Sequence, residues 1–232
     1  MSPLAETAAL FADRTRAAFC RALLDGRAWT AGELARHAGV SASTASEQLS
    51  RLVAGGLLAE ERQGRHRYVR LAGPEAAALT EALAAYDPGT PYPGNLRASV
   101  RQDAEARART CYDHLAGRLG VALADAMTAR GLVDTDSGIA VTPAGRAWLA
   151  DALDYRQPAG TRRPLVRTCL DWTERRPHLA GALGAALCAT ALERGWVRRV
   201  GSGRAVKVTA RGSEAFGELL GVSTCCSSEL RE

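Results

Sequence analysis

The apolar residues in the first third of the chain recur at helical spacing. Helices are predicted over about 10–24 and 31–37. Residues 39–41 then form a turn, and either Ser41 or Ser43 can cap a third helix. That third helix carries an apolar stripe at positions i, i+4, i+7 and i+8, formed by Ala45, Leu49, Leu52 and Val53. It is predicted to end at the glycine pair 55–56.

Two further segments follow the glycine pair and predict a β-hairpin. Residues 57–62 and 67–71 have strand character, and the turn Gln63–His66 between them includes a glycine, which tolerates positive φ. Pro74 then opens a helix that runs to about Tyr86. Helix, turn, helix and hairpin in this order is the layout of a winged helix-turn-helix. In that fold the helix after the turn enters the major groove and the hairpin lies along the DNA backbone.

The helix predicted after the turn is polar at its leading end, where a DNA-reading helix makes its contacts. Hydroxyl, amide and guanidinium groups there can reach phosphates or base edges. The candidate DNA-binding residues of this helix are Ser41, Ser43, Thr44, Ser46, Glu47, Gln48 and Arg51. Arg65, His66 and Arg67 form a positive cluster at the hairpin tip that suits phosphates. Taken singly, such residues more often cap helices or lie in solvated loops, but their occurrence together in this order favours DNA binding.

Four segments of this unit carry a family resemblance, namely 12–16, 33–35, 40–49 and 56–68. They begin Ala-Asp-Arg-Thr-Arg, Glu-Leu-Ala, Val-Ser-Ala-Ser-Thr and Gly-Leu-Leu. Over residues 8–86, about a third of its length, the chain resembles the ArsR/SmtB-type bacterial repressors. The resemblance implies a homodimer that reads an inverted-repeat operator in double-stranded DNA and is released by an inducer.

The sensor sites of that family do not carry over to this sequence. One thiol site of the family lies just before the Glu-Leu-Ala segment, where this chain has Thr30, Ala31 and Gly32. Another uses a histidine on the last helix, and residues 75–86 contain none. No metal is therefore expected at the family's usual positions. The sequence does not identify a cofactor, and none is required for the fold.

Residues 87–94 contain three prolines and two glycines and predict a semi-rigid linker, because such a segment cannot continue a helix. The linker separates a DNA-binding domain over 1–86 from a second domain over 95–220. The small and polar residues 221–232 predict a flexible tail.

The second domain repeats itself. His114–Leu123 returns 64 residues later as His178–Leu187. Upstream, Arg109–Asp113 returns as Arg167–Asp171, provided that the second copy contains a six-residue insertion.

We interpret 95–155 and 156–220 as two degenerate winged-helix-like repeats, so the predicted fold class is mainly α. Their helices lack a polar reading face. They carry leucine stripes for packing at Leu115, Leu119, Leu123 and Met127, and at Leu179, Leu183 and Leu187.

The sequence leaves three roles open for this second domain. It can enclose an effector chamber between the two copies, walled by Tyr112, Trp148, Trp172 and Trp196, or these aromatic residues can simply be core. It can also add DNA contacts, since residues 156–211 contain twelve basic and three acidic residues, a net charge of +9.

Thiols and imidazoles recur in the two copies. Cys111 and His114 stand at i and i+3 on a predicted helix, and Cys169 and His178 are their counterparts. These four residues can bind a thiophilic effector, or the two cysteines can pair as a redox switch. Free cysteine is also among the most buried residue types, so a plain core role stays open. Cys20 and Cys188 are assigned to the core.

Composition fits a soluble protein of the bacterial cytoplasm. The chain has 232 residues, 47% of them hydrophobic, a net charge of +5, and neither a signal peptide nor a run long enough to cross a membrane. No catalytic motif is present, so an enzyme is not predicted. The sequence therefore predicts a dimeric, DNA-binding transcriptional repressor whose second domain senses an effector or a redox signal. The alternative is a winged-helix module that binds small molecules or proteins without DNA.

Overall fold

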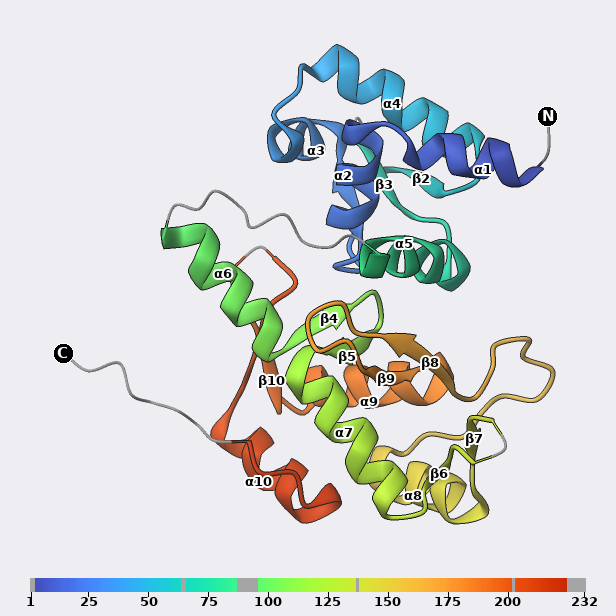
Figure 1. The fold of residues 1–232 in the computed structure, drawn as a ribbon, viewed down its shortest axis with the longest axis vertical. Coiled ribbons are helices and arrows are strands. Elements are labelled where there is room, and N and C mark those ends of the chain that lie inside the picture. Colours follow the sequence, from blue (N-terminus) through green and yellow to red (C-terminus); the bar gives the residue numbers. More distant parts are fainter. Residues whose placement is uncertain (1–2, 64–65, 87–95, 137, 202, 225–232) are drawn as a thin grey trace. The chain divides into compact units, whose positions relative to one another are not determined.

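A computed structural model of the chain describes residues 3–63, 66–86, 96–136, 138–201 and 203–224 (Figure 1). The chain divides into two compact units, Met1–Tyr86 (unit 1) and Asp87–Glu232 (unit 2). The predicted linker over 87–94 lies outside the described residues, as does most of the predicted tail. No helix among the described residues is both long enough and apolar enough to cross a membrane.

Unit 1 is a winged helix-turn-helix. Its helices and strands are α1 Pro3–Phe11, α2 Arg14–Leu23, β1 Trp29–Thr30, α3 Ala31–Ala38, α4 Ala42–Ala54, β2 Leu58–Gln63, β3 His66–Leu71 and α5 Pro74–Tyr86. The strands form one antiparallel sheet in the order β1-β3-β2. Helix α4 packs against α2 and α3 through a stripe of fully buried residues, Ala45, Leu49 and Leu52.

The helix ends of unit 1 follow from local chemistry. Thr30 accepts a hydrogen bond from the amide of Glu33, whose carboxylate accepts one in return from the amide of Thr30, so α3 begins with a capping box. These hydrogen bonds hold the pKa of Glu33 below its usual value. Gly39 ends α3 with φ of 68°, and Ser41 then caps α4 by accepting from the amide of Thr44.

Two details of unit 1 differ from the sequence prediction. The helix predicted over 10–24 is two helices, because Asp13 has an extended backbone and caps α2 by accepting from the amide of Arg16. The wing has a third strand, β1, in which Trp29 pairs with Val69. Two residues are too short to show a strand pattern in the sequence.

Unit 2 repeats one order of elements after an opening helix, α6 Leu96–Arg107. The first series is β4 Arg109–Cys111, β5 His114–Ala116, α7 Gly117–Ala129, β6 Val133–Asp134, β7 Ala140–Val141 and α8 Pro143–Leu153. The second is β8 Arg167–Leu170, β9 Pro177–Ala180, α9 Gly181–Glu193, β10 Val197–Arg199, β11 Val206–Val208 and α10 Ala210–Leu220. Each series therefore reads hairpin, helix, hairpin, helix.

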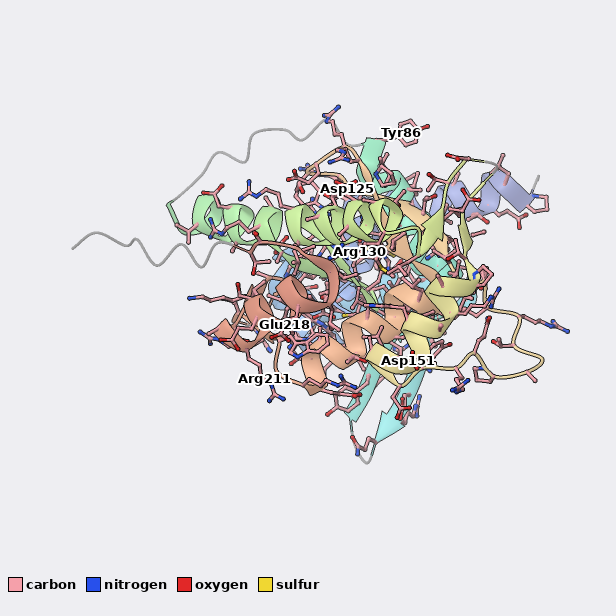
Figure 2. All side chains as sticks on the ribbon, turned by 90° about the horizontal axis from the view of Figure 1, so that it is seen from below. Tyr86, Asp125, Arg130, Asp151, Arg211 and Glu218 are labelled. Atoms are coloured by element: carbon pink, nitrogen blue, oxygen red, sulfur yellow. The ribbon has the colours of Figure 1, made fainter. Side chains whose placement is uncertain are left out.

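The two series pack on each other around a shared core. Helix α7 lies against β9 and α9 against β5, and the apolar faces of α7 and α9 contribute to one buried cluster that includes Leu123, Met127, Leu183 and Leu187. The charged residues of α7 and α10 that are labelled in Figure 2, such as Asp125 and Glu218, lie exposed on the outside of this unit.

The structure corrects two predictions about unit 2. Cys111 and His114 were predicted on one helix, but they face each other across the β4–β5 hairpin. The leucine stripes are interrupted in the same way, because Leu115 lies in β5 and Leu179 in β9, before the helices begin. The change of direction occurs at Gly117 and Gly181, which have φ of 73° and 83°. Residues three or four positions apart, as in a helix, also occur in a hairpin this short. The periodicity therefore could not distinguish a hairpin from a helix here.

Candidate nucleic-acid interface and thiol–histidine cluster

The leading end of α4 is exposed and polar. Ser41, Ser43 and Ser46 are all solvent-exposed, and Thr44 is half-buried. The hydroxyl of Ser41 lies 2.9 Å from those of both Ser43 and Thr44, in addition to capping the helix. Short hydroxyls clustered at a helix N-terminus are suited to phosphate oxygens, because the unpaired amides of that turn also favour an anion.

Glu47 and Arg51 lie one turn further along the same helix. Their side chains form an ion pair of 2.8 Å and are 60% and 59% exposed. Such an exposed pair contributes little to stability, so Arg51 can exchange Glu47 for a phosphate or a guanine at small cost.

Gln48 occupies a different environment from the other predicted readers. It is half-buried, and its side-chain oxygen accepts a hydrogen bond of 2.6 Å from the guanidinium of Arg16. The same buried guanidinium donates to the carbonyl oxygens of Ala9 and Leu10. Gln48 therefore ties α4 to α2 and to the end of α1, a role that the sequence pattern does not indicate.

The wing carries a charge network around Glu60. Arg67 in β3 and Arg62 in β2 lie 2.7 Å and 3.1 Å from the two carboxylate oxygens of Glu60. The hydrogen bond from Arg62 is the main reason that the pKa of Glu60 is lowered. Arg65 lies outside the described residues, and of His66 only the backbone, paired with Gln63, is described.

A cluster of two thiols and two imidazoles lies inside unit 2, and we call it the thiol–histidine cluster. It consists of Cys111, His114, Cys169 and His178, all buried, with one ligand atom of each residue within 4.8 Å of those of the others. The two Sγ atoms are 3.8 Å apart, and the two Nε2 atoms are 3.1 Å apart. The structure thus brings together all four residues that the repeat suggested.

Two carboxylates lie behind the imidazoles of this cluster. Oδ1 of Asp113 is 3.3 Å from Nδ1 of His114, and the other oxygen of Asp113 accepts from Arg163 at 2.6 Å. Oδ2 of Asp171 is 3.5 Å from Nδ1 of His178, at a geometry that leaves this buried nitrogen without a hydrogen bond.

Asp171 is itself fully buried and strongly held. It accepts from Arg109, also fully buried, at 2.9 Å and from the amide of Gly117 at 2.6 Å. Although burial alone would raise it, the pKa of Asp171 is held well below its usual range, chiefly by the charge of Arg109. Asp113 and Asp171 occupy equivalent positions in the repeated sequence. This repeat is the signal that could have identified Asp171 as a counterpart of Asp113.

Two groups of the cluster, Cys169 and His114, have pKa values shifted toward their charged forms despite burial. The hydrogen bond from Cys111 is the largest influence that lowers the pKa of Cys169, and the two imidazoles add to it against the opposing effect of burial. Burial would lower the pKa of His114, but hydrogen bonds to Asp113 and Cys169 outweigh it and raise that pKa. By contrast, burial raises the pKa values of Cys20 and Cys188 to about 12, as befits inert core thiols.

The aromatic residues predicted either to wall a chamber or to be core have different neighbours among the contacts described. Trp196 is buried edge-to-face against Phe216, Trp148 packs against the core, and Trp172 lies under the guanidinium of Arg109 at 4.9 Å. Tyr112 is half-buried in the β4–β5 turn with φ of 57°.

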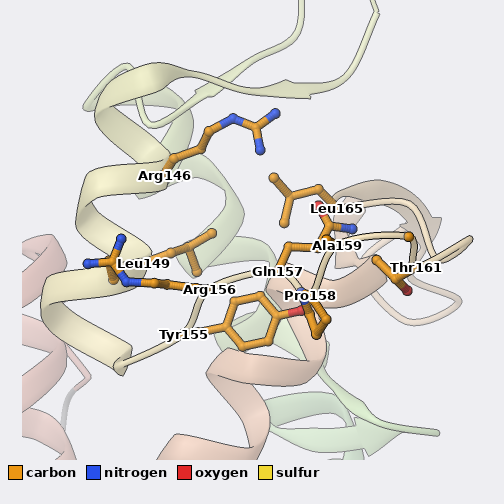
Figure 3. A pocket seen from close by; sticks show the side chains of 11 residues that line it. Arg146, Leu149, Tyr155, Arg156, Gln157, Pro158, Ala159, Thr161 and Leu165 are labelled. Atoms are coloured by element: carbon orange, nitrogen blue, oxygen red, sulfur yellow. The ribbon is translucent and has the colours of Figure 1, made fainter.

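A cavity of about 480 Å³ lies instead beside α8 and the loop that follows it (Figure 3). Tyr155, Leu149 and Leu165 supply its apolar surface, and Arg146 and Arg156 its charge. None of the four aromatic residues named above lines this cavity.

The basic stretch 156–211 forms ion pairs with acidic residues that lie before it in the chain. Arg163 pairs with Asp113, Arg176 with Asp125, and Arg204 lies 4.0 Å from Glu105. Part of its charge excess is therefore neutralised within unit 2. Contact between this stretch and DNA stays a prediction.

Comparisons with known proteins identify a helix-turn-helix in unit 1 and a relative along nearly the whole chain. A helix-turn-helix domain family matches residues 11–61. The chain is 38% identical over 225 residues to YdfF of Bacillus subtilis (strain 168), described as an uncharacterized HTH-type transcriptional regulator, and the match covers 96% of this chain and 99% of that protein.

Among solved structures, HlyU from Vibrio cholerae N16961 is 23% identical with a TM-score of 0.35 and covers 38% of this chain and 94% of that one. The cadmium metal-sensor CMTR from Mycobacterium tuberculosis is 32% identical with a TM-score of 0.30 and covers 39% of this chain and 96% of that one.

Proposed function

Because the chain belongs to the HTH-type transcriptional regulators and is a DNA-binding protein of that class, we propose that it acts as a homodimeric repressor of an inverted-repeat operator. Helix α4 would enter the major groove, and the β2–β3 wing would contact the phosphate backbone. A protein that binds the chromosome works in the cytoplasm, which is the location we assign to it.

The observation that carries this proposal is the exposed polar face at the leading end of α4. Ser43 and Ser46 offer hydroxyls there, and Arg51 offers a guanidinium held only by an exposed ion pair with Glu47. The corresponding first turns of α7 and α9 are largely buried and have no side-chain cap. The described residues of α7 and α9 therefore lack the exposed polar face that α4 has.

We assign direct readout to Ser43, Ser46, Glu47 and Arg51, and phosphate contact to the wing arginines. Ser41 and Thr44 are assigned to the capped first turn, which favours a phosphate. Gln48 is assigned to holding α4 in place, because its oxygen already binds Arg16.

Substitution of Arg51 tests the readout. Arg51→Ala is expected to weaken binding to the operator by about 1–3 kcal/mol and to relax base preference at one position. The measurement is fluorescence anisotropy on operator DNA and on single-base variants of it. Arg118→Ala, which removes an exposed arginine from α7 in unit 2, is the matched control and should leave binding unchanged. Equal weakening on every sequence would make Arg51 a phosphate contact, and no effect would remove it from the interface.

A homodimer is supported by apolar side chains that unit 1 leaves exposed. Leu4 on α1 is 78% exposed, and Leu79, Leu83 and Tyr86 on α5 are 36%, 44% and 88% exposed. Leu79, Leu83 and Tyr86 stand at i, i+4 and i+7 and so lie on one face of α5, and an exposed apolar face of a helix is typical of an interface with another protein. A second copy of this chain would also supply the second recognition helix that an inverted repeat requires.

For unit 2, we propose that the two series of elements are degenerate winged-helix units that arose from one sequence. Each series places a helix, a short hairpin and a second helix in the winged-helix order. Thr142 and Thr209 cap the last helix of each series in the same way, by accepting from the amides of Gly145 and Gly212. The absence of a polar reading face on α7 and α9 favours a sensory or supporting role for this unit.

A further inference from the structure

Two hairpins of the same design supply the thiol–histidine cluster. Cys111 pairs with His114 across β4–β5, and Cys169 pairs with His178 across β8–β9. Residues directly opposite in an antiparallel pair project on the same face of the hairpin. Each hairpin therefore presents one sulfur and one imidazole nitrogen, and the packing of β5 against β9 turns the two pairs toward each other.

We propose that Cys111, His114, Cys169 and His178 bind one thiophilic divalent cation of the Zn²⁺ class in a tetrahedral site. With metal–sulfur bonds of about 2.3 Å and metal–nitrogen bonds of about 2.0 Å, such a site places its two sulfurs about 3.8 Å apart and its two nitrogens about 3.3 Å apart. The corresponding distances in the cluster are 3.8 Å and 3.1 Å. Two sulfurs and two imidazoles also match the ligand preference of this class of ion.

The surroundings of the two imidazoles give a second, geometric argument. Oδ1 of Asp113 lies 3.3 Å from Nδ1 of His114, and Oδ2 of Asp171 lies 3.5 Å from Nδ1 of His178, so each ring has a carboxylate behind it. The two Nε2 atoms face each other at 3.1 Å, and a cation bound there would accept a lone pair from each of them. The carboxylate–histidine arrangement is also the one that metal-binding histidines commonly have.

The site would hold the two copies of unit 2 together. Four protein ligands leave no open position, so the ion would be structural or regulatory and not catalytic. The two copies approach each other closely at Gly184, since a Cβ there would lie only 3.1 Å from Cβ of His114. The ion would therefore link the β4–β5 and β8–β9 hairpins to each other. Helix α9 approaches the first hairpin there, and helix α7 approaches the second.

Metal binding at this cluster does not depend on DNA binding, so an experiment can disprove either proposal without affecting the other. The test uses the full-length, reduced and metal-free chain, titrated with Co²⁺ as a spectroscopic substitute for Zn²⁺. The expected result is one Co²⁺ per chain, with a thiolate-to-cobalt charge-transfer band and the intense visible bands of tetrahedral cobalt. Added Zn²⁺ should abolish these bands by displacing the cobalt.

Variants locate the site. Cys111→Ser combined with Cys169→Ser is expected to abolish the charge-transfer band, and His178→Gln is expected to weaken Co²⁺ binding while keeping thiolate character. Cys188→Ser is the matched control, a buried unit 2 cysteine outside the cluster, and should bind Co²⁺ normally. Cys225→Ser with Cys226→Ser should also bind normally, which excludes the two remaining thiols of this unit as the ligands.

Three results would overturn the proposal, and none of them requires a variant to fold. The first is a reduced wild-type chain that takes up no Co²⁺. The second is a weak spectrum of six-coordinate cobalt, which would show adventitious binding to surface carboxylates. The third is oxidation that joins Cys111 to Cys169 in a chain that binds no metal, which would make the cluster a redox pair.

Discussion

The side chain of Gln48 shows how one residue of a reading helix can serve the fold. Its oxygen satisfies the buried guanidinium of Arg16, which also holds the carbonyl oxygens at the end of α1. Gln48→Ala is expected to destabilise unit 1 by about 1–3 kcal/mol, because it leaves a buried charged donor unsatisfied. The measurement is the free energy of unfolding in urea.

The matched control for this change is Ser46→Ala, which removes an exposed hydroxyl from the same helix. It should alter stability by less than about 0.5 kcal/mol. If Gln48→Ala left stability intact and changed only the preferred base, Gln48 would be a reader, as its position in the sequence suggests.

At the scale of single residues, the sequence predicts local capping contacts well and contacts between distant residues poorly. A serine cap for α4 could be predicted, because a hydroxyl at that place accepts from the backbone of its own helix, and of the two candidates Ser41 is the cap. The contact between Arg16 and Gln48 joins residues 32 positions apart, and no local pattern reports it. The repeat aligns Asp171 with Asp113, but the contacts of Asp171 with Arg109 and Gly117 could not be predicted, since these partners lie 62 and 54 positions away.

At the scale of elements, periodicity identified the long helices and misread the hairpins of unit 2. The spacing between the paired thiol and imidazole argues against a helix in both copies. This spacing is three residues for Cys111 and His114 but nine for Cys169 and His178, because of the insertion in the second copy. A pair fixed by helical spacing cannot survive such an insertion, whereas a hairpin can lengthen its loop and keep the same cross-strand partners.

Helix α10 contains two glycines, of which one has no room for a side chain and the other has room. A Cβ at Gly212 would collide with the carbonyl oxygen of Trp196, while one at Gly217 would meet nothing within 4 Å. Gly212→Ala is therefore expected to destabilise unit 2 by about 1–3 kcal/mol through overpacking. Gly217→Ala should stabilise it by about 0.5–1 kcal/mol, because glycine inside a helix costs conformational entropy.

Thermal unfolding of the two variants checks this pair, with circular dichroism to confirm that both fold. Each is the control for the other, since both add one methyl group to the same helix. Equal effects of the two changes would show that the carbonyl of Trp196 does not lie against α10 as described.

At the scale of the whole molecule, the assembly of two chains is the first property to test. Leu79→Glu combined with Leu83→Glu is expected to convert the dimer to a monomer, because it buries charge in the proposed interface. Light scattering coupled to size-exclusion chromatography measures the mass. Val200→Glu is the control, a substitution of a residue in unit 2 that is 41% exposed, and should leave the mass unchanged. A wild-type chain that is monomeric at micromolar concentration would refute the dimer.

The composition and charge of the chain were compatible with DNA binding without requiring it. A net charge of +5 permits a polyanionic partner, yet part of the basic excess of unit 2 is used in ion pairs within that unit. The arrangement of polar residues on one helix of unit 1 therefore carries the functional prediction better than the charge of the whole molecule does.

The most direct test of sequence-specific repression is a salt titration of the reduced, full-length protein on DNA from upstream of its own gene, with a scrambled duplex of equal length beside it. Tighter binding to the upstream DNA, with an affinity that falls steeply as salt rises, is the predicted result, because specific contacts add to the release of counterions from phosphates. Equally weak binding to both duplexes would contradict the account, and would favour a winged-helix module that binds other molecules.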